Sequence, residues 1–145
     1  MTTTRSATVV ATIVLATCCG YVQRGSWTDD PRNWYRIFGE AKPDEVTLVH
    51  SFYERLPGFR MRYRFYLAFE APAEARERLV ARLSLSPLPH DLAPTDAAGA
   101  DPARPAWFAP GDPGDYRIWI DAPNRRLRMF VNPDTGATYL SDRRS

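Results

Sequence analysis

The stretch that decides the fold reads Phe59-Arg60-Met61-Arg62-Tyr63-Arg64-Phe65-Tyr66-Leu67-Ala68-Phe69-Glu70. Six large apolar residues alternate with residues that are mostly polar, which is the period of a strand with one buried face. Phe65 stands near the centre of the apolar set, and its neighbour Arg64 points to the opposite, solvated face. The stretch therefore predicts a β-strand over residues 59–70 that covers a hydrophobic core.

A second alternating stretch lies just upstream, over residues 46–53. The residues assigned to its inward face are Val46, Leu48, His50 and Phe52. Between the two stretches, Pro57 fixes φ and Gly58 supplies a positive φ, as a tight turn requires. These features predict a long antiparallel hairpin with His50 facing inward.

The other elements follow from caps, charge order and alternation. Asp30 and Gly39 bracket a short helix, and Pro72 opens a second helix over residues 73–84. Strands are expected over 116–121, 126–131 and 137–141. Residues 84–115 hold seven of the thirteen prolines and no periodicity, so they are expected to form a long loop anchored by Trp107 and Phe108.

Together these elements predict a single α+β domain over residues 29–145. Its order is helix, two strands, helix, three strands, with about five strands in one antiparallel sheet. The second helix is expected to cover the apolar face, and the proline-rich loop to cross one edge of the sheet.

The N-terminal segment has the pattern of an export signal. Arg5 is its only charge, residues 7–16 are nearly all apolar, and the run is shorter than the ~20 residues needed to span a bilayer. We assign residues 1–18 to a signal peptide and residues 19–28 to a tether. The two cysteines, Cys18 and Cys19, both lie at this junction, so the domain has neither a disulfide nor a cysteine zinc site.

The junction Leu15-Ala16-Thr17-Cys18 resembles the lipobox of bacterial lipoproteins. Thr17 stands where that family usually has Gly, Ala or Ser, and Cys19 is the alternative lipidation site. The resemblance implies that Cys18 is lipidated and becomes the mature N-terminus, which anchors the protein to a membrane. Lipoproteins of this family use Asp after the lipidated cysteine for inner-membrane retention, and Cys19 stands there instead. In a double-membraned cell the resemblance therefore implies the outer membrane, facing the periplasm.

The composition of the chain limits the classes of partner and cofactor that we expect. A formal net charge of +2 gives no reason to expect nucleic acid as a partner. About 127 residues remain after the leader, enough for one self-sufficient core. No cofactor or metal motif is present, and the sequence predicts none.

The search for catalytic residues finds no specific constellation. His50 and Ser51 are adjacent in a strand, so their side chains point to opposite faces and cannot form a nucleophile–base pair. The sequence contains no nucleophile elbow, phosphate-binding glycine loop or His-Glu-x-x-His motif. Whether the protein is an enzyme is left open, with a non-enzymatic role favoured.

A basic face is the candidate binding site. If the hairpin and the C-terminal strands share one sheet, several arginines with interleaved aromatics project from its polar side. The candidate residues for binding an anion or a glycan are Arg60, Arg62, Arg64, Arg117, Trp119, Arg126 and Arg128. The alternative interpretation is an ordinary solvated face, partly covered by the helix that follows Asp30.

The sequence thus predicts a membrane-anchored envelope lipoprotein that acts as a non-enzymatic binding or accessory module. Its partners would be the membrane, through the lipid anchor, and an envelope polymer or an envelope protein. Two alternatives stay open. One is an envelope hydrolase with its site beside the 84–115 loop, and the other is an inhibitor or structural partner protein.

Overall fold

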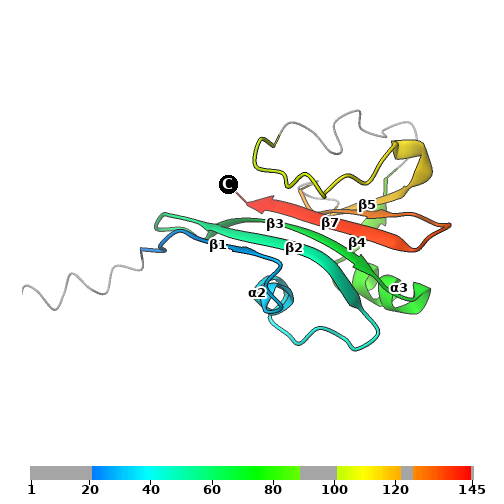
Figure 1. Ribbon diagram of the computed structural model, residues 1–145, viewed down its shortest axis with the longest axis horizontal. Helices are drawn as coiled ribbons and strands as arrows, with labels where there is room; N and C mark the ends of the chain where they lie inside the picture. Colours follow the sequence, from blue (N-terminus) through cyan, green and yellow to red (C-terminus); the bar gives the residue numbers. More distant parts are fainter. Residues whose placement is uncertain (1–20, 89–100, 122–125, 145) are drawn as a thin grey trace, which may run out of the picture.

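One antiparallel sheet dominates the computed structural model, which describes residues 21–88, 101–121 and 126–144 (Figure 1). Within these residues the strand order is β1-β2-β3-β7-β6-β5-β4. The strands are β1 Gly25–Thr28, β2 Thr47–Leu56, β3 Arg62–Glu70, β4 Leu85–Pro87, β5 Arg117–Asp121, β6 Arg128–Val131 and β7 Ala137–Arg144. The α-helices are α2 Asn33–Phe38 and α3 Ala73–Arg82, and a 3₁₀ helix, η3, spans Pro113–Asp115.

The α+β class, the single domain and the two predicted helices are confirmed, but in the described part of the chain the sheet has seven strands and not about five. The additional strands are the two edges. β1 lies in the expected tether, and β4 lies in the expected proline-rich loop. Both contain only three or four residues and include Gly25 or Pro87, so their own strand propensity is weak. Short edges of this kind resist pairing with other chains.

The predicted hairpin is confirmed, with a longer connection than expected. β2 pairs with β3 from Thr47 opposite Glu70 to Leu56 opposite Arg62, which leaves residues 57–61 as the hairpin loop. The strand therefore begins at Arg62 rather than at Phe59. Phe59 is 76% exposed, so the first part of the alternating stretch covers no core.

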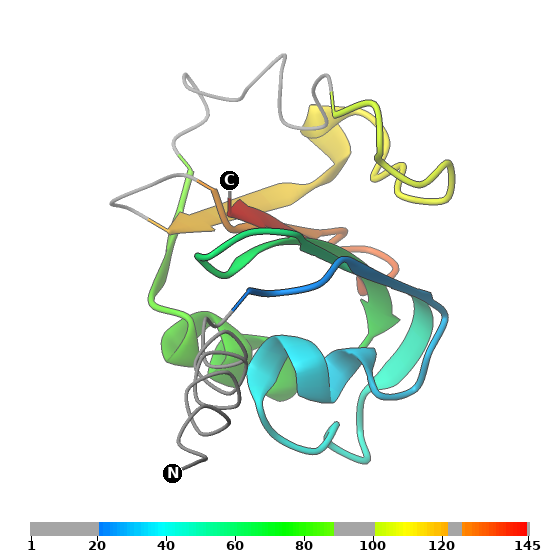
Figure 2. The same ribbon diagram turned by 90° about the vertical axis from the view of Figure 1, so that its left-hand side faces the viewer.

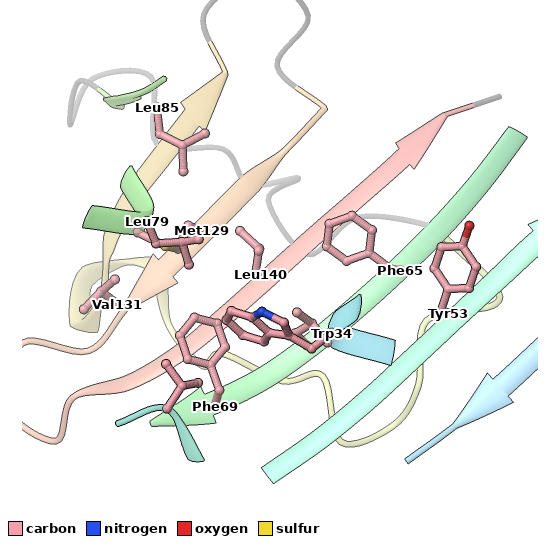
Figure 3. Packing of buried hydrophobic residues seen from close by; sticks show 11 residues of the cluster. Trp34, Tyr53, Phe65, Phe69, Leu79, Leu85, Met129, Val131 and Leu140 are labelled. Atoms are coloured by element: carbon pink, nitrogen blue, oxygen red, sulfur yellow. The ribbon is translucent and has the colours of Figure 1, made fainter. Parts of the chain in front are cut away.

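The two helices cover one side of the sheet, which we call the helix-side face (Figure 2). Trp34 from α2 and Leu79 from α3 join the sheet residues Phe69, Met129 and Leu140 in one buried cluster (Figure 3). The rings of Trp34 and Phe69 meet edge to face at 5.8 Å. The expectation that the second helix packs on the apolar face is therefore confirmed.

The opposite side of the sheet, the loop-side face, is covered by residues 101–116 (Figure 1). Phe108 is 1% exposed and packs on Tyr66, Phe130 and Tyr139, with ring centroids 4.9–6.2 Å apart. The sequence correctly identified Phe108 as an anchor. The segment crosses a face of the sheet and not an edge, because β3 offers apolar side chains on both of its faces.

The first helix does not cover the arginine-bearing face of the sheet, as the alternative interpretation of that face expected. α2 packs on the helix-side face, away from Arg64 and Tyr66. Asn33, which is fully buried, fixes it there by donating from Nδ2 to the Ser51 hydroxyl and to the Trp27 carbonyl, both at 3.0 Å. Gly39 ends the helix with a φ of 73°, as its predicted C-terminal role requires.

A β-bulge at Val49 corrects the predicted phase of β2. Leu48 pairs with Phe69, but His50 pairs with Ala68, so one extra residue separates the two pairs. Beyond the bulge every side chain changes face. His50 consequently lies on the loop-side face, half-exposed and stacked on Trp107 at 5.2 Å, and not in the core as expected.

Candidate functional site

The structure does not bring the seven predicted binding residues together. Residues opposite each other in antiparallel strands share a face, so Arg64 and Tyr66 belong to the loop-side face with Phe130. Arg128 shares that face, because it pairs with Ile120. Arg117 and Trp119 point to the helix-side face, where Trp119 packs against the main core.

Arg62 shares the loop-side face with Arg64, which follows two residues later in β3, whereas Arg60 and Arg126 lie outside the strands. Arg60 is exposed in the hairpin loop, and Arg62 at the start of β3 donates to the Pro57 carbonyl at 3.2 Å. Arg126 lies just before β6 and is exposed. The prediction that these arginines share a single basic face is therefore wrong. It assumed that all aliphatic residues face one core, whereas Ile118 and Ile120 pack under the Phe108 segment.

Arg64 is held in a network of charges on the loop-side face. Its guanidinium contacts Glu54 Oε2 at 2.5 Å and Asp101 Oδ1 at 3.3 Å. Arg24 donates to Glu54 Oε1 at 2.8 and 3.0 Å. The Glu54 side chain is only 3% exposed, so the two arginines offset a carboxylate that the fold removes from water.

Asp101 extends this network to the covering segment. Its Oδ2 accepts a hydrogen bond from the Tyr66 hydroxyl at 2.7 Å. Burial acts to raise the pKa of Asp101, but the Ala103 N–H, Tyr66 and the nearby arginines outweigh burial and lower that pKa. The pKa of Tyr66 is raised, first by burial and then by Asp101. We interpret this network as a clamp that holds residues 101–116 on the sheet.

A groove on the helix-side face is the better candidate for a binding site. It lies between α3 and the strands β5 and β6, with a volume of about 380 Å³, within the range of small-molecule sites. Its apolar lining includes Val80, Trp119, Met129 and Val131. Met129 and Val131 project from β6 in Figure 3. Two of the seven predicted residues, Arg117 and Trp119, thus line the same groove.

Local sequence explains the walls of this groove. Alternation in β5 places Arg117 and Trp119 on one face, and Trp119 pairs with Met129 across the sheet. Val80 and Arg76 lie four residues apart on α3, hence on one side of the helix. The Arg76 guanidinium donates to the carbonyl of Ala71 at 2.5 Å and remains a cation at the wall.

A smaller groove of about 210 Å³ lies between α3 and the segment that follows α2. Its rim carries two ion pairs, Arg78 with Glu45 at 2.6 Å and Arg82 with Glu40. Trp34 contributes to its lining, and within the described residues the Trp34 indole N–H has no hydrogen-bond acceptor. The charged groups on its rim are already paired with each other. This groove is therefore a weaker candidate for binding a charged ligand than the larger groove.

Sequence reasoning missed two polar contacts near the ends of the sheet. Asp142 accepts a hydrogen bond from the Tyr63 hydroxyl at 2.9 Å. Burial raises the pKa of Asp142, and burial together with Asp142 raises the pKa of Tyr63 to about 12. His50 Nδ1 lies 3.3 Å from Asp29 Oδ2, but both side chains are about half-exposed and neither lines the two grooves. Within the described residues no group of three potential ligands could hold a metal ion.

Comparisons of the chain with protein-family models, with curated proteins and with solved structures find no match. In the part of the chain that the structure describes, no helix is long and apolar enough to cross a bilayer. The predicted lipidation site, Cys18 or Cys19, lies outside the described residues. The candidate site therefore rests on the geometry of the groove alone.

Proposed function

We propose that the protein is a lipid-anchored component of the bacterial cell envelope whose domain is a non-enzymatic binding module. The anchor is supported by the export signal and by the lipobox-like junction at Cys18. Binding is supported by one observation above all. The groove between α3 and β5–β6 combines an apolar lining with Arg117 and Arg76.

The lining specifies the chemistry of the ligand. Val80, Trp119, Met129 and Val131 favour an apolar body, and a guanidinium group binds carboxylates and phosphates through paired hydrogen bonds. Glu77 is the only acid among the lining residues. The ligand is accordingly an amphiphile with one anionic group, such as an acyl or lipid-derived molecule of the envelope.

The alternatives receive less support from the structure. A hydrolase would need a base held within a cleft, and the contact between His50 and Asp29 lies at a half-exposed position outside both grooves. A partner protein would use the 84–115 loop together with the edge of the sheet. In the described part of that loop, Phe108 and Asp101 already contact the sheet and are not available to a partner.

Titration calorimetry with octanoate and with its neutral counterpart 1-octanol tests the binding site. We expect octanoate to bind, and Arg117→Ser to weaken it by about ten- to a hundredfold, since a hydrogen bond to a charged group contributes ~1.5–3 kcal/mol. Binding of 1-octanol should be weaker and insensitive to Arg117. Trp119→Ala should weaken both ligands by removing apolar contact.

Arg60→Ser is the matched control, because it removes an exposed arginine outside the groove. It should leave octanoate binding unchanged. The proposal fails if wild type binds neither probe, or if Arg117→Ser and Arg60→Ser bind octanoate equally well.

A further inference from the structure

The end of the sheet beside Tyr21, where the described chain begins, carries a cluster of exposed apolar side chains. Tyr21 is 55% exposed, Phe59 76% and Met61 59%, and the Tyr21 and Phe59 rings meet edge to face at 5.5 Å. These three are the contact residues of what we call the hairpin tip, residues 21 and 57–61. Aromatic and methionine side chains exposed side by side are unfavourable in water unless another surface covers them.

The hairpin tip is fixed in place by backbone pairing with Val22. Val22 and Gly58 exchange backbone hydrogen bonds of 2.9 and 3.2 Å, so the chain enters the fold directly at the hairpin loop. Gly58 has a φ of 149°, which favours glycine at this position. The tip is therefore a defined feature of the fold.

Covalent geometry places the hairpin tip close to the proposed anchor. Only Cys19 and Gly20 separate Tyr21 from Cys18. At most ~3.3–3.6 Å per residue, the backbone at Tyr21 lies within about 11 Å of an acylated Cys18. A lipid anchor at Cys18 would hold the tip at the membrane surface.

Basic residues surround the apolar side chains at this end of the sheet. Arg60 and Arg62 alternate with Phe59 and Met61 along the chain, and both arginines are exposed. β7 also ends here, because its Arg144 pairs with Tyr63 near the start of β3. Apolar and aromatic groups bordered by arginine suit an interface where acyl chains meet anionic headgroups.

We propose that the hairpin tip is a second membrane contact, which seats on an anionic phospholipid surface beside the lipid anchor. This inference rests on the anchoring part of the proposed function. It also gives the domain an orientation. Across β7, the groove residues Met129 and Val131 lie level with Leu67 and Phe69 of β3, so the groove lies roughly 20 Å along the sheet from the tip. In Figure 1, α3, which forms one wall of the groove, lies at the end of the sheet away from the hairpin loop.

Site-specific fluorescence in vesicles tests this contact. The full chain, expressed with its leader and carrying Cys19→Ser, is labelled with an environment-sensitive dye at Phe59→Cys. The control carries the same dye at Asp134→Cys, an exposed position in the turn before β7 at the opposite end of the sheet. Both proteins are reconstituted in vesicles of phosphatidylethanolamine and phosphatidylglycerol that contain a spin-labelled quencher lipid.

We expect quenching at residue 59 to be several-fold stronger than at residue 134, because interfacial side chains reach the boundary between headgroups and acyl chains. Omitting phosphatidylglycerol, or raising the salt concentration, should reduce the difference. Equal quenching at the two positions in an acylated preparation would overturn the contact and leave the anchor intact.

The mass of the same preparation separates the two proposals. If the chain carries no acyl groups, the anchor fails, and the protein is labelled again with the additional change Cys18→Ser, so that the dye is confined to residue 59 or 134, and mixed with the same vesicles. Stronger quenching at residue 59 would then support the tip as an independent membrane contact. Equal quenching at both positions would overturn it.

Discussion

Truncation of Phe108 to alanine should destabilise the protein by about 3–5 kcal/mol, the cost of removing a buried phenylalanine from a core. Such a loss is unusual for a residue outside any helix or strand. Phe108 is 1% exposed, and its ring meets the rings of Tyr66, Phe130 and Tyr139. It supplies the centre of the second hydrophobic layer, so its removal uncovers the loop-side face. Urea unfolding followed by circular dichroism measures the change.

Phe59→Ala is the matched control, because Phe59 is 76% exposed and covers no core in the domain. It should change the free energy of unfolding by less than ~0.5 kcal/mol. Limited proteolysis provides a second readout, since Phe108→Ala should make residues 101–116 accessible to cleavage under native conditions. Equal unfolding midpoints for the two variants would contradict the docking of this segment.

Arg64→Ala should cost about 3 kcal/mol, because removing one partner of a buried ion pair leaves the other charge uncompensated. The Glu54 side chain is 3% exposed and would retain only Arg24, whose own side chain is 69% exposed. Asp101 would also lose its contact with Arg64, which weakens the clamp on residues 101–116. The free energy of unfolding at neutral pH measures the loss.

Arg62→Ala provides the comparison two residues earlier in the same strand. Arg62 is exposed, and its guanidinium donates a hydrogen bond to the Pro57 carbonyl. The expected loss in free energy of unfolding is therefore below ~1 kcal/mol. Combining Arg64→Met with Glu54→Leu should restore much of the stability, because an apolar pair of similar volume often replaces a buried ion pair without loss. If Arg62→Ala and Arg64→Ala unfold at the same urea concentration, the network is not buried as described.

Local patterns predicted the hairpin, both helices and the C-terminal strands because each depends on a short run of residues. Alternation identified β3, and Pro72 with its charged neighbours identified α3. The sequence did not predict the edge strands β1 and β4, because they are stabilised by pairing with β2 and β5 and not by the strand propensity of their own residues. The bulge at Val49 cannot be recognised from the alternation of residues alone, so the sequence prediction put His50 on the wrong face of the sheet.

The candidate site was only partly predictable for a related reason. Alternation within β5 correctly paired Arg117 with Trp119, but it could not tell which face of the sheet they share with the other strands. That choice depends on Phe108, which comes from a distant segment and turns the supposed solvated face into a second core. The acids that neutralise Arg64 are also remote in sequence, at positions 54 and 101. Neither association has a local signal.

The mass of the mature N-terminus tests the proposed anchoring most directly. The protein is expressed with its leader in a bacterial host, extracted from membranes and analysed intact and after proteolysis. We expect the mature chain to begin at Cys18 and to carry the added mass of acyl groups on that residue. An unmodified chain that begins near Tyr21, or an intact chain that begins at Met1, would contradict a lipid-anchored envelope protein.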